Sequence, residues 1–145
     1  MSRVLYVETS AVLRIAIEED RTLLPHLAKA RRLVTSALTR VEALRTLRRG
    51  ERERRIDGRQ LREKHRWVTG LMRSCEILPL DEATLERASL EFPVEPVRAL
   101  DAIHLASMLG CMERIGRPVM VSCDARVREN ALALGIDVLP ARLPK

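Results

Sequence analysis

Residues 3–12 read RVLYVETSAV, an apolar run that ends at a carboxylate followed by two hydroxyls. Val4 to Val7 are β-branched, aromatic or large and apolar, and the run is too short for a helix. Continuous apolarity of this kind is typical of a parallel strand that is covered on both faces. Thr9 or Ser10 can then N-cap a short helix that runs from Ala11 onward.

Glu8 follows this strand directly. In open parallel α/β sheets, ligands bind beyond the carboxyl ends of the strands, which makes Glu8 a candidate site residue. The alternative is a loop acid beside a capping pair. These ten residues alone leave both interpretations open.

The bulk composition predicts one soluble domain that spans residues 1–145. The three cysteines are an odd number, lie far apart and form no C-x-x-C pair, which indicates neither a zinc site nor a disulfide framework. The first apolar run is too short for a signal-peptide core, and no run approaches the length of a membrane span. We therefore expect a cytoplasmic protein without membrane association.

The net charge of +6 is concentrated in one segment. Between Arg45 and Arg66 there are ten basic and four acidic residues, a surplus that equals the net charge of the whole chain. Such a segment fits a polyanionic partner, because neutralised phosphates supply most of the sequence-independent affinity for nucleic acids. A solvated helix with mixed charges is the alternative. With only three aromatic residues in the chain, binding by stacked bases is disfavoured.

Strand and helix patterns alternate along the chain. Apolar or β-branched stretches predict strands at residues 4–7, 32–36, 76–80, 118–122 and 137–139. Helical spacing predicts helices at residues 11–18, 20–31, 39–50, 60–74, 82–90, 99–112 and 126–134, the last closed by Gly135. Asp81 is the expected N-cap of the helix that starts at Glu82. This alternation predicts an α/β fold with a parallel sheet between two helical layers.

Two acids have local structural explanations. Thr39 and Glu42 have the spacing of a capping box, and the local sequence favours that role for Glu42. Asp101 stands at the start of an apolar helix, where the helix dipole stabilises an acid, and His104 shares its face one turn later.

A different role follows if the acids meet at the carboxyl edge of the sheet. Glu8, Glu42, Asp101 and Asp124 would then repel one another unless cations neutralised them. Hard oxygen ligands with room for water suit Mg²⁺ or Mn²⁺.

Four segments together resemble the motifs of PIN-domain proteins, and above all those of the VapC-type ribonuclease toxins of bacterial toxin–antitoxin pairs. They are Val7-Glu8-Thr9-Ser10-Ala11, Leu38-Thr39-Arg40-Val41-Glu42, Leu100-Asp101-Ala102-Ile103-His104-Leu105-Ala106 and Val121-Ser122-Cys123-Asp124. The resemblance covers essentially the whole chain. It implies a parallel sheet in the order 3-2-1-4-5 and a metal-dependent endoribonuclease site with Mg²⁺ or Mn²⁺.

The resemblance also implies roles for single residues. Glu8, Glu42, Asp101 and Asp124 match the four acids of the family in order, and Glu8, Asp101 and Asp124 are the implied metal ligands. Ser10 matches a hydroxyl beside the metals.

Further residues support this site. His104 falls in the helix motif, where packing or hydrogen bonding is favoured over ligation. Arg45, Arg48 and Arg49 follow Glu42 on its helix and are placed to meet the RNA backbone.

Glu8 departs from the family pattern, which ordinarily has Asp at this position. The extra methylene moves the carboxylate outward by roughly 1.5 Å, whereas Mg²⁺ requires near-ideal octahedral geometry. Either a preference for Mn²⁺ or a weakened enzyme is consistent with this change. The alternative function is therefore a PIN-like module that binds RNA or protein without cutting.

The resemblance implies partners as well: RNA, a small VapB-like antitoxin whose tail crosses the acidic site, and a second copy in a homodimer. Two other doubly wound classes fit poorly. A response-regulator receiver needs adjacent acids at the first strand and a late-strand lysine, but the only lysines are Lys29, Lys64 and Lys145. A haloacid-dehalogenase-like phosphatase needs Asp-x-Asp where this chain has Glu-Thr-Ser.

Overall fold

The computed structural model describes residues 3–143, and the end residues of the predicted domain, 1–2 and 144–145, lie outside them. The elements follow in the order β1 (Val4–Val7), α1 (Thr9–Ala16), α2 (Leu24–Lys29), β2 (Arg32–Ser36), α3 (Ala37–Arg52), α4 (Gly58–Ser74), β3 (Cys75–Leu78), α5 (Glu82–Ala88), α6 (Ala99–Arg114), β4 (Pro118–Val121), α7 (Ala125–Ala133) and β5 (Val138–Leu139).

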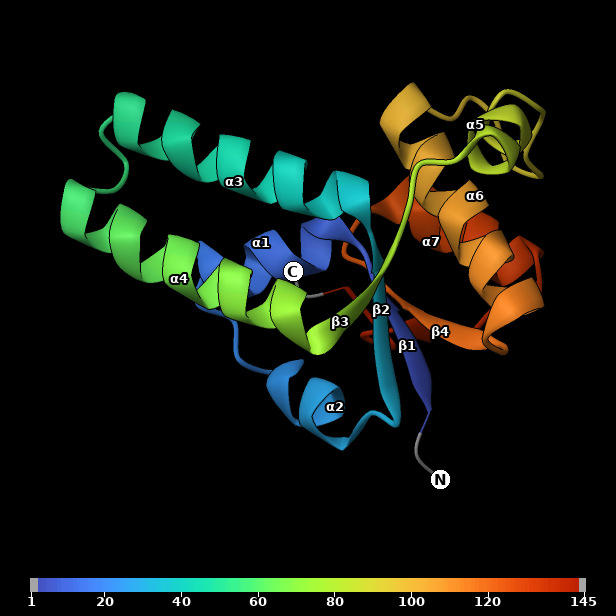
Figure 1. The fold of residues 1–145 in the computed structure, drawn as a ribbon, viewed down its shortest axis with the longest axis horizontal. Coiled ribbons are helices and arrows are strands. Elements are labelled where there is room, and N and C mark those ends of the chain that lie inside the picture. The colour runs from blue at the N-terminus through green and yellow to red at the C-terminus, as the bar shows by residue number, and fades with distance from the viewer. Residues whose placement is uncertain (1–2, 144–145) are drawn as a thin grey trace.

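The strands form one parallel sheet in the order β3-β2-β1-β4-β5, which confirms the predicted topology. Helices α1 to α4 lie on one side of this sheet and α5 to α7 on the other, so the architecture has three layers (Figure 1). The central strand β1 pairs with β2 and β4, with Val4 opposite both Arg32 and Pro118. The end of β1 therefore lies in the middle of the carboxyl edge.

Strand β1 is apolar throughout because it belongs to both cores. Leu5 and Val7 pack with α1, α3 and α4, whereas Val4 and Tyr6 pack with α6 and α7. All four side chains are buried, as expected for alternate residues that point to opposite faces of a covered sheet.

The start of α3 corrects one prediction. Ser36, the last residue of β2, is the N-cap, and its hydroxyl accepts a hydrogen bond from the Leu38 N–H at 3.1 Å. Thr39 lies buried inside the first turn, where its hydroxyl accepts a hydrogen bond from that of Thr35 at 2.8 Å. The predicted capping box of Thr39 and Glu42 is wrong, which leaves Glu42 free for another role.

Other helix bounds also differ from the sequence patterns. Glu8 is the N-cap of α1, which starts at Thr9 rather than Ala11. Helix α3 does not end at Gly50 but continues to Arg52. Helix α2 is shorter than residues 20–31 because Asp20 instead forms a turn, accepting hydrogen bonds from both the N–H and the hydroxyl of Thr22.

Two predicted features of helix ends are confirmed. Asp81 caps α5, and Gly135 follows α7 with a φ of 78°, a conformation that glycine adopts without strain. Within residues 3–143, no helix is long and apolar enough to cross a membrane.

The Asp81 cap gives a pH-dependent stability prediction. Its carboxylate accepts hydrogen bonds from the Thr84 hydroxyl, the Thr84 N–H and Arg114, which together lower the pKa of Asp81 to about 2. A lowered folded-state pKa adds stability above the unfolded value of about 4, and this stability is lost as pH falls through about 2. Asp81→Ala should therefore melt below the wild type at pH 7, and the difference should shrink towards pH 2 in thermal unfolding. A difference independent of pH would contradict this.

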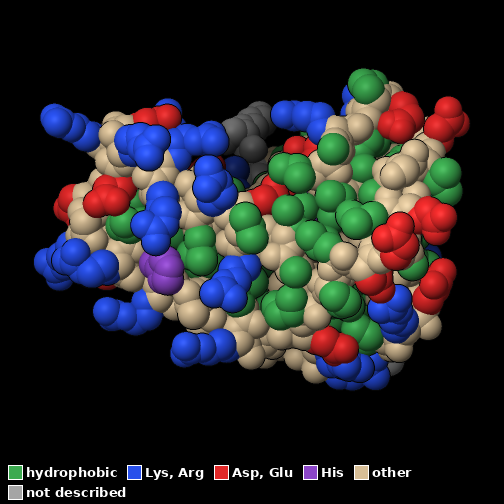
Figure 2. Space-filling view, turned by 45° about the horizontal axis from the view of Figure 1, so that its top comes forward, with side chains coloured by type: hydrophobic (Ala, Val, Ile, Leu, Met, Phe, Trp, Pro, Cys, Tyr) green, Lys and Arg blue, Asp and Glu red, His purple; other side chains and the backbone are tan. Residues whose placement is uncertain are grey.

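Helices α3 and α4 form a long antiparallel pair that projects beyond the sheet (Figure 1). Leu47 of α3 and Val68 and Met72 of α4 are buried between the pair and the sheet. Lys and Arg side chains gather over this pair (Figure 2), as the charge distribution of residues 45–66 predicts.

Candidate active site

Glu8 is fixed by hydrogen bonds at the carboxyl end of β1. Its Oε1 accepts the Ser10 N–H at 3.1 Å, which caps α1, and its Oε2 accepts the hydroxyls of Ser10 and of Ser122, the latter at 2.8 Å. The Glu8 side chain reaches over the end of the sheet, so it joins β1 to the end of β4. Only 4% of the residue is exposed.

Two serines extend this connection to the fourth predicted acid. The Ser10 hydroxyl accepts the Cys123 N–H at 2.8 Å, and the Ser122 hydroxyl accepts the Asp124 N–H at 3.1 Å. Ser122 was not among the predicted site residues. Its signal in the sequence was its position two residues before Asp124, at the end of a buried strand.

Asp101 and Asp124 lie near Glu8. Asp101 is in the first turn of α6, and Asp124 caps α7 by accepting the Val127 N–H at 2.9 Å. Burial raises the pKa of the Asp101 carboxyl, and the negative charges of Asp124 and Glu8 raise it further. Three acids from separate parts of the chain thus share one region of the carboxyl edge.

Glu42 lies beside this group with hydrogen-bond partners of its own, and the His104 Nε2 that contacts it is also 3.9 Å from Glu8 Oε1. Its Oε1 accepts the Thr9 hydroxyl at 2.7 Å and lies 2.6 Å from Nε2 of His104. Burial alone would raise the pKa of the Glu42 carboxyl, but the hydrogen bonds from His104 and Thr9 outweigh burial and lower it. The pKa of Asp101 is therefore raised by its surroundings, whereas the pKa of Glu42 is lowered by its hydrogen-bond donors.

His104 connects Glu42 to the core. The ring is fully buried, with Nδ1 3.0 Å from the Tyr6 hydroxyl and Nε2 near both Glu42 and Thr9. Sequence patterns missed Tyr6 and Thr9 as site residues, because Tyr6 belongs to an apolar strand and Thr9 to a capping pair. A single phenol within an otherwise aliphatic buried run was the available signal.

The model of the PIN domain matches residues 5–132 of this sequence. The chain belongs to the PIN domain family. PIN domains are generally nucleases, and such nucleases generally use divalent metal ions.

Two solved structures share the fold of this PIN domain. PAE2754 from Pyrobaculum aerophilum is 21% identical, with a TM-score of 0.61 over 95% of this chain and 84% of that one. VapBC-1 from nontypeable Haemophilus influenzae is 12% identical, with a TM-score of 0.62 over 93% of this chain and 96% of that one. A comparison with curated proteins finds no significant match.

The acids of this PIN domain suit a divalent cation by their chemistry. Carboxylate oxygens are hard ligands, and a cation would relieve the repulsion among Glu8, Asp101 and Asp124. Within residues 3–143, Asp101 accepts no hydrogen bond and meets only Arg98, at 4.0 Å. No three His, Cys, Asp or Glu side chains of the described part are already arranged as a metal site.

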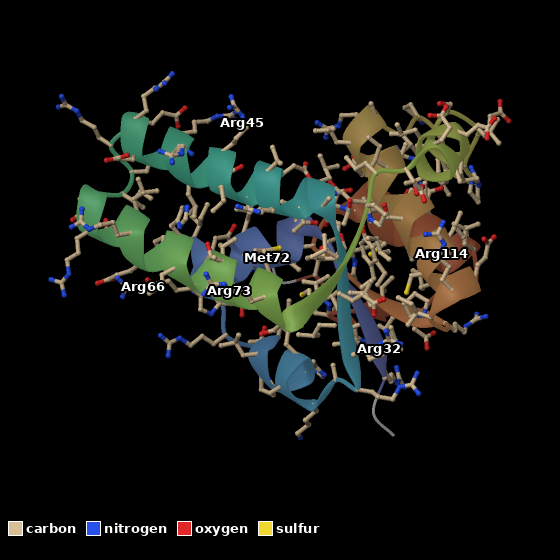
Figure 3. The ribbon with its side chains drawn as sticks, viewed as in Figure 1. Arg32, Arg45, Arg66, Met72, Arg73 and Arg114 are labelled. Carbon is tan, nitrogen blue, oxygen red and sulfur yellow. The ribbon has the colours of Figure 1, made fainter. Side chains whose placement is uncertain are left out.

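A row of arginines leads away from the acids along α3. Arg45 and Arg49 follow Glu42 by three and seven residues and share its face of the helix, with Arg48 beside them. All three are exposed, and none forms an ion pair with another residue of the described range 3–143. Arg45 points away from α4 (Figure 3), so its guanidinium is open to a ligand.

Proposed function

We propose that this PIN domain is a metal-dependent endoribonuclease, the toxin component of a type II toxin–antitoxin pair. The observation that supports the proposal is that Glu8 and Asp124 follow the neighbouring strands β1 and β4, and that their negative charges reach Asp101. A group of like charges that is partly removed from water is costly unless a cation joins it. The membership in a family of nucleases supports the same conclusion.

Glu8, Asp101 and Asp124 would hold Mg²⁺ or Mn²⁺. When bound, such an ion supplies an activated water and neutralises negative charge on the scissile phosphate. Asp124 is oriented by its capping bond to α7, and Glu8 by the Ser10 and Ser122 hydroxyls. Glu42 contributes a fixed carboxylate beside them, where it accepts a hydrogen bond from water that approaches the phosphorus. No side-chain nucleophile is needed.

Arg45 and Arg49 are proposed to bind RNA phosphates. Replacing both with Gln should weaken RNA binding and lower the dependence of log K on log salt by about 1.4, because each lost phosphate contact on a single strand removes about 0.7. Fluorescence anisotropy at several salt concentrations measures this. The matched control replaces Arg21 and Arg31, which are exposed and lie outside α3. An equal loss in the control would contradict the proposal.

We further propose a small antitoxin as partner, which rests on the fold shared with VapBC-1. A basic side chain of the antitoxin tail would neutralise Asp101 and its neighbours in place of a metal ion. Adding the antitoxin should then inhibit cleavage, and excess Mn²⁺ should partly restore it.

A second copy of this chain is the proposed occupant of an apolar groove between α3, α4 and β3. Figure 2 shows hydrophobic side chains gathered between the α3–α4 pair and the α5–α6 pair. Val41 and Ile77 line the groove. Both are large apolar residues that are nevertheless exposed, Val41 to 54% and Ile77 to 42%. Exposed apolar surface of this kind marks an interface.

Light scattering tests the dimer. The wild type should have twice the 16.5 kDa mass of the chain, and Val41→Glu should have the mass of one chain. Leu132→Glu is the matched control, since Leu132 of α7 is 57% exposed and outside the groove. A monomeric wild type, or dissociation caused by Leu132→Glu, would overturn this assignment.

The nuclease proposal is tested with antitoxin-free protein, structured and unstructured RNAs, and Mn²⁺, Mg²⁺ or EDTA. Cleavage with metal and none with EDTA is the expected result. If no RNA is cleaved with either metal ion, the alternative is favoured, a PIN-like module that binds RNA or protein. The observation that favours this second candidate is that Glu8 already accepts hydrogen bonds from Ser10 and Ser122, with which a metal ion would have to compete.

A further inference from the structure

The buried residues Tyr6, His104 and Thr9 form one continuous hydrogen-bonded chain with the partly exposed Glu42. It starts at the Tyr6 hydroxyl, 3.0 Å from Nδ1 of His104, and crosses the ring to Nε2. From Nε2 it continues 2.6 Å to Glu42 Oε1 and 3.1 Å to the Thr9 hydroxyl. The chain thus runs from the core side of β1 to the acidic edge, and joins β1, α1, α3 and α6.

The contacts determine which atom holds each proton around Glu42. The Thr9 hydroxyl donates its only proton to Glu42 Oε1, so towards His104 it can only accept. An ionised carboxylate also only accepts. Nε2 of His104 must therefore carry a proton and donate to both, whether or not Nδ1 is protonated.

Packing alone does not explain a histidine at this position. The ring is fully buried, and an apolar side chain of similar volume would fill the space without the cost of removing polar atoms from water. The Tyr6 and His104 rings meet edge to face, with centroids 6.2 Å apart, so Tyr6 also limits the tilt of the ring. The hydrogen bond between Nδ1 and Tyr6 and this edge-to-face contact thus direct Nε2 at Glu42.

Glu42 gains a fixed orientation from this contact. It projects from α3 with 23% of its side chain exposed, and Oε1 receives both hydrogen bonds. Within residues 3–143, Oε2 has no hydrogen-bond partner, which leaves it for water or substrate. Without His104, Thr9 alone would hold a flexible side chain.

We propose that His104 is a positioning residue that, with Tyr6 behind it, fixes the Glu42 carboxylate at the acidic edge. Its kinetic consequence rests on the proposed nuclease function. The hydrogen-bonded arrangement itself does not, so the two can be tested separately.

The kinetic test compares His104→Leu with His104→Gln. His104→Leu should lower kcat by about 100-fold, the effect of a slightly misplaced group, while KM for RNA stays within about twofold. His104→Gln retains an N–H near the position of Nε2 and should recover most of kcat. His26→Leu on α2, an exposed histidine outside the basic segment, is the matched control and should leave kcat unchanged.

A double-mutant cycle isolates the contact between His104 and Glu42. In a Glu42→Gln background, His104→Leu should cause no further loss of kcat. A full additional 100-fold loss in that background, or no rescue by His104→Gln, would show a merely structural role and overturn the proposal.

Nitrogen-15 NMR of the histidine rings tests the arrangement without any cleavage. Nε2 of His104 should carry a slowly exchanging proton whose signal moves in Glu42→Ala, and Tyr6→Phe should move the Nδ1 signal. An unprotonated Nε2, or an Nε2 signal that does not move in Glu42→Ala, would overturn the proposal. If wild-type protein cuts no RNA but these signals appear as expected, the nuclease proposal fails and the positioning of Glu42 stands.

Discussion

Replacing Asp101 with Asn is expected to reduce metal-dependent RNA cleavage by about 1000-fold, or about 4 kcal/mol of transition-state stabilisation. Asp101 is half-buried beside Glu8 and Asp124 and, among residues 3–143, is bound by no hydrogen-bond donor. It is therefore the acid most available to a cation. The neutral amide keeps the shape but removes the charge. Initial rates in saturating Mn²⁺ measure the effect.

The thermal stability of Asp101→Asn shows whether a loss of cleavage comes from unfolding. Burial and the charges of Asp124 and Glu8 raise the pKa of Asp101, so the stability that its protonated form contributes is lost as pH rises through that pKa. Asn cannot ionise. Without metal at pH 7, Asp101→Asn should consequently melt at the wild-type temperature or above it.

Asp137→Asn is the matched control for charge removal. Asp137 precedes β5 at the amino edge of the sheet, where it lies 3.9 Å from Arg3 and is 79% exposed. It should cut RNA at the wild-type rate. Full activity in Asp101→Asn, or equal losses in both variants, would contradict the assignment of Asp101.

The second large effect is expected from Glu8→Asp, which should raise the Mn²⁺-dependent cleavage rate about tenfold and lower stability by about 1 kcal/mol. A side chain shorter by one methylene still caps α1 but no longer spans to Ser122. One carboxylate oxygen is then released for a cation. Cleavage rates and thermal unfolding with and without Mn²⁺ measure both parts.

Ser122→Ala separates the two consequences of that change. It removes the same hydrogen bond to Glu8, and with it the acceptor of the Asp124 N–H, but keeps the longer acid. It should share the loss of stability, with a smaller gain in cleavage. If Glu8→Asp binds Mn²⁺ no better than the wild type, the serine contacts do not limit the site.

Much of the fold could be predicted from local sequence patterns. The run of Val4 to Val7 predicts a central strand because only a strand covered on both faces is apolar at every position. Helix starts were less predictable where two caps compete. Ser36 and Thr39 are both good N-caps, and the end of β2 at Ser36 decides between them.

The candidate site was predictable as a set of residues but not as an arrangement. Glu8, Asp101 and Asp124 are recognisable by their places at element ends, whereas Glu42 lies inside α3. Which partners each acid has depends on side-chain contacts between distant segments, such as Glu8 with Ser122 and Glu42 with His104. Local spacing carries no information on such contacts, which is why the capping box looked sufficient for Glu42.

The most direct measurement is a calorimetric titration of Mn²⁺ into antitoxin-free protein and into its Asp101→Asn variant. We expect saturable binding by the wild type that is abolished or strongly weakened in the variant, because Asp101 shares its charge environment with Glu8 and Asp124. No binding by the wild type, or equal binding by both proteins, would contradict a metal-dependent nuclease site at this edge.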